Sequence, residues 1–255
     1  MSAQPLPDTL FTGQNLIELA SVSSTNTYAK DLLANSKPIE GTVIMAYAQA
    51  EGRGQPGSIW LSEPGKNLTV SYIFYPVFLE AQMQFYLNMA VALAVKDCCE
   101  FLLNDEVKIK WPNDVYVGNR KIAGILLENS ISGTNISSAI AGIGLNVNQT
   151  GFDASLPNPT SLCLIKQKEF DLKETLHTLS AFLEKYYLQL RQQHFNFLEK
   201  AYTTSLFRYQ QTQEFRKGDK VIRGEINGVS KEGKLIIHSS GREMRFGFKE
   251  VEYVI

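Results

Sequence analysis

The sequence contains few of the residues that build metal sites or disulfide scaffolds. Its 255 residues include three cysteines, Cys98, Cys99 and Cys163, with no C-x-x-C pair among them, and three scattered histidines. Structural zinc sites usually use such spaced pairs, and disulfide frameworks use an even set of cysteines. We therefore expect a reducing compartment and a chemistry that uses neither a cysteine nor a histidine cluster.

A surplus of basic charge is missing too. The chain has 25 Lys+Arg against 26 Asp+Glu, whereas nucleic-acid binders usually carry a clear basic excess. The first residues lack the features of a signal peptide, and the longest apolar-looking run, 85–99, is interrupted by Asn88, Lys96 and Asp97. These absences predict a cytoplasmic protein that neither binds DNA nor spans a membrane.

The hydrophobic pattern predicts an α+β fold. Strands are expected over 15–20, 41–50 and 68–75, and then in hairpins between 107 and 148. Successive hairpins favour an antiparallel-rich mixed sheet, because parallel strands need long crossovers. Helices are expected over 28–33 and 80–103, and from the capping residue Asp171 to about 206. Frequent turn signals after residue 210 predict a small C-terminal β-barrel.

A glycine-rich segment, residues 52–57 (Gly-Arg-Gly-Gln-Pro-Gly), fits the pattern G-x-G-x-x-G. A Rossmann fingerprint must open a helix that receives a pyrophosphate, whereas residues 58–65 end in a Pro-Gly turn. A kinase loop is excluded because the accompanying signatures are absent. The remaining interpretation is a flexible loop in which Arg53 offers a planar guanidinium to carboxylate or phosphate. A surface turn with an exposed arginine is the alternative.

A second cluster, residues 110–114 (Lys-Trp-Pro-Asn-Asp), joins a cation, an indole, a rigid turn and a carboxylate. Residues that flank a hairpin turn lie close together, so we expect Lys121 to face Lys110 and Asp114. Two lysines and an aspartate suit a triphosphate with its magnesium, because cations bind phosphate oxygens and a carboxylate binds the hard metal. A solvated hairpin is the alternative, but it leaves Trp111 and Pro112 unexplained.

These and other blocks together resemble a known family, the biotin protein ligases. The blocks occur in the family's order: Ser24-Thr25-Asn26, Gln49, residues 52–57 with Trp60, residues 110–114, residues 121–126 and residues 142–148. The resemblance is strong between residues 16 and 148 and looser beyond. It implies a class II synthetase-like biotin/lipoate ligase catalytic domain over 1–210 and an SH3-like β-module over 211–255.

The reaction that the resemblance implies has two steps. Biotin and Mg-ATP give biotinyl-5'-adenylate and pyrophosphate, and a lysine of a biotin carboxyl carrier protein then takes the biotinyl group. ATP and Mg²⁺ are the implied cofactors, with biotin as substrate. Too few residues precede the first strand for a DNA-binding helix-turn-helix, so we expect the ligase-only form, as a monomer or a ligand-promoted homodimer.

The resemblance also implies roles for single residues. The biotin-binding residues would be Ser24, Thr25, Asn26, Gln49, Arg53, Gly54, Gln55, Trp60, Lys121 and Gly124. The ATP-binding residues would be Gly52, Arg53, Lys110, Asn113, Lys121 and Asn146. The metal ligands would be Asp114 and Asn146, and the catalytic residues Arg53, Lys110, Asp114 and Lys121. Many members have an arginine where this chain has Gln55, a loss of charge that would weaken retention of the adenylate.

Two other functions are compatible with parts of the sequence. A lipoate–protein ligase shares the general architecture, but its own glycine and arginine motifs are not found here. A non-enzymatic biotin-binding regulator would use the C-terminal β-module on nucleic acid, yet basic and acidic residues alternate there, which is typical of a solvated face.

Overall fold

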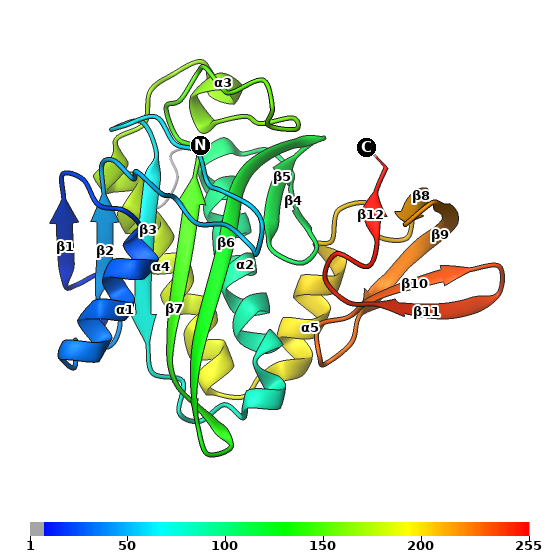
Figure 1. Cartoon of the computed structure of the whole chain (residues 1–255), viewed down its shortest axis with the longest axis horizontal. Helices are drawn as coiled ribbons and strands as arrows, with labels where there is room; N and C mark the ends of the chain where they lie inside the picture. The colour runs from blue at the N-terminus through cyan, green and yellow to red at the C-terminus, as the bar shows by residue number, and fades with distance from the viewer. Residues whose placement is uncertain (1–7, 255) are drawn as a thin grey trace.

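The computed structural model describes residues 8–254 and has two β-sheets (Figure 1). The larger sheet has the strand order β1-β2-β3-β7-β6-β5-β4. Its strands are β1 (Leu16–Leu19), β2 (Val43–Ala46), β3 (Leu68–Phe74), β4 (Val107–Lys110), β5 (Asp114–Val117), β6 (Arg120–Ser132) and β7 (Asn135–Leu145). The β1–β2 pair is parallel and all other neighbours in this sheet are antiparallel. The predicted antiparallel-rich sheet is thus confirmed.

Within residues 8–254, five α-helices and a short 3-10 turn accompany this sheet. The helices are α1 (Thr25–Asn35), α2 (Phe85–Leu103), α3 (Leu162–Lys166), α4 (Leu172–Arg191) and α5 (Phe195–Thr204), and the turn is Ala81–Met83. The Asp171 side chain caps α4 by accepting the N–H groups of Lys173 at 2.8 Å and Glu174 at 2.9 Å. The helical region predicted up to about 206 is divided, because Gln193 has a φ of +57° and redirects the chain.

The two faces of the large sheet carry different layers (Figure 1). Alternate residues of a strand point to opposite faces, and β2 follows this rule: Val43 and Met45 pack in the main core, whereas Ile44 packs with Ala29 of α1. Helix α2 is buried almost all round, as expected of a helix between a sheet and further helices. Helix α1 covers part of the other face, and the remaining part carries the candidate site.

The second sheet follows the helices and has the order β11-β10-β9-β8-β12. Its strands are β8 (Thr212–Lys217), β9 (Lys220–Val229), β10 (Leu235–Ser239), β11 (Arg242–Phe246) and β12 (Glu252–Tyr253). The Trp111 indole N–H donates to the Gly233 carbonyl at 3.0 Å and so joins this sheet to the segment after β4. The predicted fold class is confirmed, whereas the boundary at 210/211 stays a prediction.

Candidate active site

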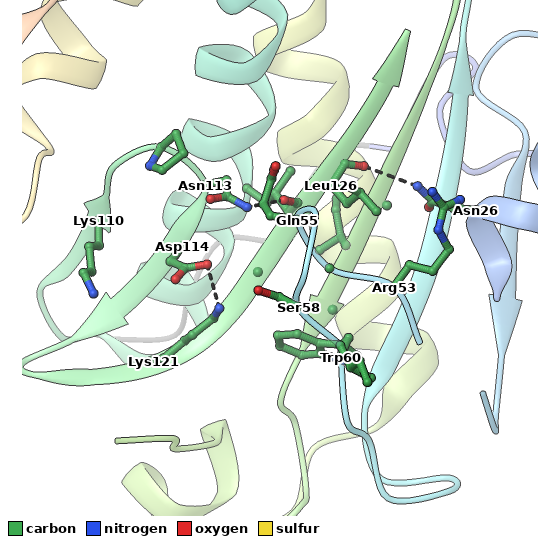
Figure 2. Close-up of a pocket in the computed structure, with 18 of the residues that line it drawn as sticks. Asn26, Arg53, Gln55, Ser58, Trp60, Lys110, Asn113, Asp114, Lys121 and Leu126 are labelled. Atoms are coloured by element: carbon green, nitrogen blue, oxygen red, sulfur yellow. Dashed lines mark hydrogen bonds and ion pairs between the residues drawn. The ribbon is translucent and has the colours of Figure 1, made fainter. Parts of the chain in front are cut away.

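A cavity of about 420 Å³ lies on the part of the large sheet that α1 leaves uncovered. Figure 2 shows the glycine-rich loop above it and the β4–β5 segment at one side. The volume suits a small-molecule substrate. Thirteen of the predicted site residues line it: Ser24, Thr25, Asn26, Gln49, Arg53, Gly54, Gln55, Trp60, Lys110, Asn113, Asp114, Lys121 and Gly124. Gly52 and Asn146 are not among the lining residues.

The floor of the cavity is made of glycines on two neighbouring strands. Gly124 of β6 pairs with Gly144 of β7, and the Trp60 ring lies against both. A Cβ atom on Gly144 would lie 2.2 Å from that ring, and one on Gly142 would lie 2.2 Å from the Asn26 Oδ1 atom. Side chains at these positions would therefore displace Trp60 and Asn26. The glycines keep an apolar floor of backbone and indole.

One end of the cavity is polar and formed by the start of α1. The Thr25 backbone N–H donates to Gln49 Oε1 at 2.8 Å, and the Ser71 hydroxyl donates to Asn26 Oδ1 at 2.6 Å. The Asn26 amide in turn donates to Glu128 Oε2 at 2.8 Å. These bonds fix the orientation of the Gln49 and Asn26 side chains, which line the cavity and present polar groups to a ligand.

The glycine-rich loop folds into a narrow hairpin. The Gly54 N–H donates to the Ser58 carbonyl at 3.1 Å, and the Trp60 N–H donates to the Gly52 carbonyl at 2.9 Å. A Cβ atom on Gly52 would lie 2.1 Å from the Trp60 carbonyl oxygen, so only glycine fits there. The next element is strand β3, not a helix, which agrees with our exclusion of a Rossmann fingerprint. Gly52 therefore serves the shape of the hairpin.

Arg53 of this loop forms an ion pair that sequence analysis did not anticipate. Its guanidinium donates twice to Glu128, at 2.9 Å to Oε1 and at 3.1 Å to Oε2. Figure 2 shows Arg53 beside Asn26 and well away from Lys121. Arg53 therefore lines the cavity, but its guanidinium lies at the polar end, beside Asn26, and not at the end that carries Lys121.

The other end of the cavity carries an ion pair across the β5–β6 hairpin. Lys121 Nζ lies 2.7 Å from Asp114 Oδ1, and both side chains are largely shielded from solvent. The same Nζ atom lies 5.7 Å from the centre of the Trp60 ring. The expected meeting of Lys121 and Asp114 is therefore found, at the edge of the apolar floor.

Lys110 lies in a more apolar setting than expected. Its Nζ atom is 5.1 Å from the centre of the Tyr116 ring and 5.2 Å from that of Tyr253. Burial lowers the pKa of Lys110, and the negative charge of Asp114 opposes this shift. Burial also raises the pKa of Tyr116, which stays an uncharged neighbour. Lys110 is thus a partly desolvated cation held between two rings.

The segment between these lysines is held by several elements. The Pro112 carbonyl accepts hydrogen bonds from Asn88 Nδ2 and from the Tyr202 hydroxyl, both at 2.9 Å. Asn113 Nδ2 donates to the Ile125 carbonyl at 2.6 Å. The predicted ATP-binding Asn113 therefore borders the cavity while its amide fastens the segment to β6.

Asn146 is placed differently from its predicted role. Its amide donates to the Thr160 carbonyl at 2.9 Å, and its side chain is buried. Within residues 8–254 no group of three or more His, Cys, Asp or Glu side chains could hold a metal ion. Asp114 and Glu252 are the carboxylates of the cavity lining. Asn146 does not line the cavity, and its role as a metal ligand stays a prediction.

Sequence analysis missed Glu128, Ser71 and the C-terminal segment 248–253, part of which lines the cavity. The first two carried a signal: two-residue periodicity puts Glu128 on the same face of β6 as Gly124, and Ser71 on the same face of β3 as Thr69. The C-terminal segment carried none, because its approach depends on how the second sheet packs.

Comparison with known proteins settles the family. Residues 18–146 match the biotin/lipoate A/B protein ligase family. The chain belongs to this family. It is 37% identical over 141 residues to the bifunctional ligase/repressor BirA of Bacillus spizizenii, a match that covers 55% of this chain and 43% of that protein. It is also 28% identical over 237 residues to the biotin–[acetyl-CoA-carboxylase] ligase of Paracoccus denitrificans, covering 89% of this chain and 95% of that protein.

Among solved structures, the biotin protein ligase from Aquifex aeolicus in complex with biotin and ATP superimposes with a TM-score of 0.79. It is 27% identical in sequence, and the match covers 94% of this chain and 98% of that one. The predicted resemblance to biotin protein ligases, and the enzyme class that it implies, are thereby confirmed. None of the helices within residues 8–254 is long and apolar enough to cross a membrane.

Proposed function

We propose that this member of the family is an ATP-dependent biotin protein ligase. The observation that carries the proposal is the order of groups along the cavity. A polar end formed by Thr25, Asn26 and Gln49 leads over the glycine and Trp60 floor to the cations Lys110 and Lys121. Biotin has the same order of parts: a polar ureido ring, an apolar chain and a carboxylate. The relatives named for biotin support the assignment.

In the first step, a carboxylate oxygen of biotin attacks the α-phosphorus of ATP, and the bond to pyrophosphate breaks. Both reactants are anions, so their repulsion must be neutralised by fixed positive charge. Lys121 would supply this charge, and its ion pair with the Asp114 carboxylate at 2.7 Å supports that role. Lys110 would bind the remaining phosphates. Orientation supplies the rest of the acceleration, since attack on phosphorus needs no covalent enzyme nucleophile.

Magnesium would enter with the triphosphate. Mg²⁺ is usually held by one or two carboxylates together with substrate phosphates, and Asp114 offers such a carboxylate at the cationic end of the cavity. The residues therefore fit a metal that depends on the nucleotide. Bound magnesium would neutralise phosphate charge, while Lys121, released from Asp114, would contact the reacting carboxylate.

In the second step, the amine of a carrier lysine attacks the biotinyl carbonyl, and AMP leaves. We propose that the acceptor is a biotin carboxyl carrier protein, as the name of the Paracoccus relative suggests, and that the reaction takes place in the cytoplasm. The hairpin of residues 52–60 would shield the adenylate, a mixed anhydride that water hydrolyses. Arg53 and Gln55 lie on this hairpin and would contact the intermediate.

Lipoate is the competing acid, since the family includes lipoate ligases. The dithiolane ring of lipoate has no N–H or C=O group, so it could not form the hydrogen bonds to Thr25, Asn26 and Gln49 that the ureido ring of biotin could form, a loss of about 0.5–1.5 kcal/mol for each hydrogen bond. The test is pyrophosphate release from Mg-ATP with either acid. Release that depends on biotin supports the proposal, and equal or greater release with lipoate would contradict it.

A further inference from the structure

Glu128 is a carboxylate near the polar end of the cavity that the proposed reaction does not use. Its two oxygens accept hydrogen bonds from two of the predicted ligand-binding residues near this end, Asn26 and Arg53. Glu128 lies on β6, four residues after Gly124. Because alternate residues of a strand share a face, it lies on the face that carries the cavity. The Glu128 side chain thus connects the start of α1 to the glycine-rich loop.

The bond to Asn26 determines which way the Asn26 amide points. A carboxylate is an acceptor only, so it receives the Nδ2 side, while the Ser71 hydroxyl donates to the Oδ1 side at 2.6 Å. Asn26 is 3% exposed, and a buried amide without a partner would turn or bind water. Glu128 at 2.8 Å, the more distant Leu126 carbonyl at 3.5 Å and Ser71 together keep one orientation of the amide before any ligand arrives.

The bond to Arg53 has the opposite character. It must break, and the Arg53 side chain must swing from the polar end toward Lys121 (Figure 2), for Arg53 to act on a substrate anion there. The Arg53 side chain is 44% exposed and that of Glu128 is 28% exposed. Ion pairs with this degree of exposure are weak. A carboxylate or phosphate in the cavity could therefore take the guanidinium from Glu128. In the ligand-free protein Glu128 holds the guanidinium, and a bound anion would compete with Glu128 for it.

We propose that Glu128 is a positioning residue with two separable effects on acid binding. It holds the Asn26 amide in the orientation that receives the uncharged ring end of the ligand, and it withholds Arg53 until the anionic end displaces it. This inference rests on the proposed function, because it takes biotin as the acid. It predicts that one substitution separates the two effects, since glutamine keeps an acceptor for Asn26 but loses the charge that holds Arg53.

The experiment is calorimetric titration without ATP, with biotin and with biotinol, in which an uncharged CH₂OH group replaces the carboxylate. For Glu128→Gln we expect biotin to bind about two- to fivefold more tightly, the range for losing a weak ion pair, while biotinol binding stays unchanged. For Glu128→Ala we expect biotinol to bind about tenfold more weakly, since the buried Asn26 Nδ2 atom keeps only the Leu126 carbonyl, at 3.5 Å, as an acceptor. The ratio of biotin to biotinol affinity should rise in both variants.

Two controls isolate these effects. Glu51→Gln removes a carboxylate that has no hydrogen-bond or ion-pair partner within residues 8–254, so it reports any general effect of charge and should leave the ratio unchanged. In an Arg53→Ala background, Glu128→Gln should no longer alter the ratio. Thermal unfolding of each variant reports the fold, and Glu128→Gln remains a test if Glu128→Ala does not fold.

An unchanged ratio in Glu128→Gln would refute the competition for Arg53, and unchanged biotinol affinity in a folded Glu128→Ala would refute the orienting role. Wild-type protein that binds neither compound would instead contradict the proposed function itself, and with it this inference. A purely structural role for Glu128 would weaken both ligands equally and leave the ratio constant, which also overturns the proposal.

Discussion

Replacing Lys121 by alanine is the substitution that most directly probes the cationic end of the cavity. In the proposed first step, Lys121 neutralises the negative charge that develops as carboxylate and α-phosphate approach. Removing one preorganised group of this kind costs about 10²- to 10³-fold in rate, or about 3–4 kcal/mol. We therefore expect biotin-dependent pyrophosphate release by Lys121→Ala to fall by about that factor at saturating substrates.

The fold should survive this change. The Lys121–Asp114 pair is about a quarter exposed on each side, and such pairs contribute about 1 kcal/mol or less to the free energy of unfolding. Lys108→Ala is the matched control, because Lys108 also forms an ion pair, with Glu106 at 2.9 Å, but does not line the cavity. Pyrophosphate release by Lys121→Ala within a few-fold of the Lys108→Ala rate would refute the proposed role of Lys121.

Three further predictions concern other parts of the molecule. Asp114→Ala should raise the magnesium concentration needed for half-maximal pyrophosphate release, because the cavity loses a carboxylate oxygen for the metal; a superimposable titration would remove Asp114 from the metal site. The pKa of Lys110 is lowered from the ordinary value of 10.5, so in the free protein its ammonium group loses the proton at a pH below 10.5. We therefore expect kcat/KM for ATP to fall as the pH rises through the lowered pKa of Lys110. Lys110→Arg should move the fall to higher pH, and an unmoved profile would show that another group causes it. Glu184 of α4 accepts three backbone N–H groups of residues 10–12 at 2.7–3.0 Å; Glu184→Ala should lower the free energy of unfolding by about 2–4 kcal/mol in urea denaturation, and a loss under about 1 kcal/mol, the size of a surface substitution, would contradict that anchoring role.

Local interactions explain what the sequence predicted well. The turn at Gly118 and the short β5–β6 hairpin bring Lys121 to Asp114, and this geometry follows from chain separation and hairpin register alone. The cap that Asp171 forms on α4 and the strand that follows the glycine-rich loop also depend on interactions between residues close in the sequence. Each depends on residues a few positions apart, so sequence patterns suffice.

Long-range packing explains what the sequence did not predict. The pairing of Arg53 with Glu128 joins residues 75 positions apart, and it depends on how the hairpin of residues 52–60 lies across β6. Asn146 follows β7 directly, yet its amide is bonded to the Thr160 carbonyl because residues 158–160 run beside Lys121. Tyr253 of the second sheet reaches Lys110 of β4 although the two residues are far apart in the sequence. Motif order assigns residues to a site without fixing where their side chains point.

The central claim is tested most directly by the transfer of biotin to a carrier. A biotin carboxyl carrier domain is incubated with the protein, biotin and Mg-ATP, and its intact mass is measured. We predict a mass increase of one biotinyl group, which maps to a single lysine and is lost when ATP is omitted or that lysine is replaced by arginine. A carrier that keeps its unmodified mass, or that gains a lipoyl group but no biotinyl group when both acids are present, would contradict the account.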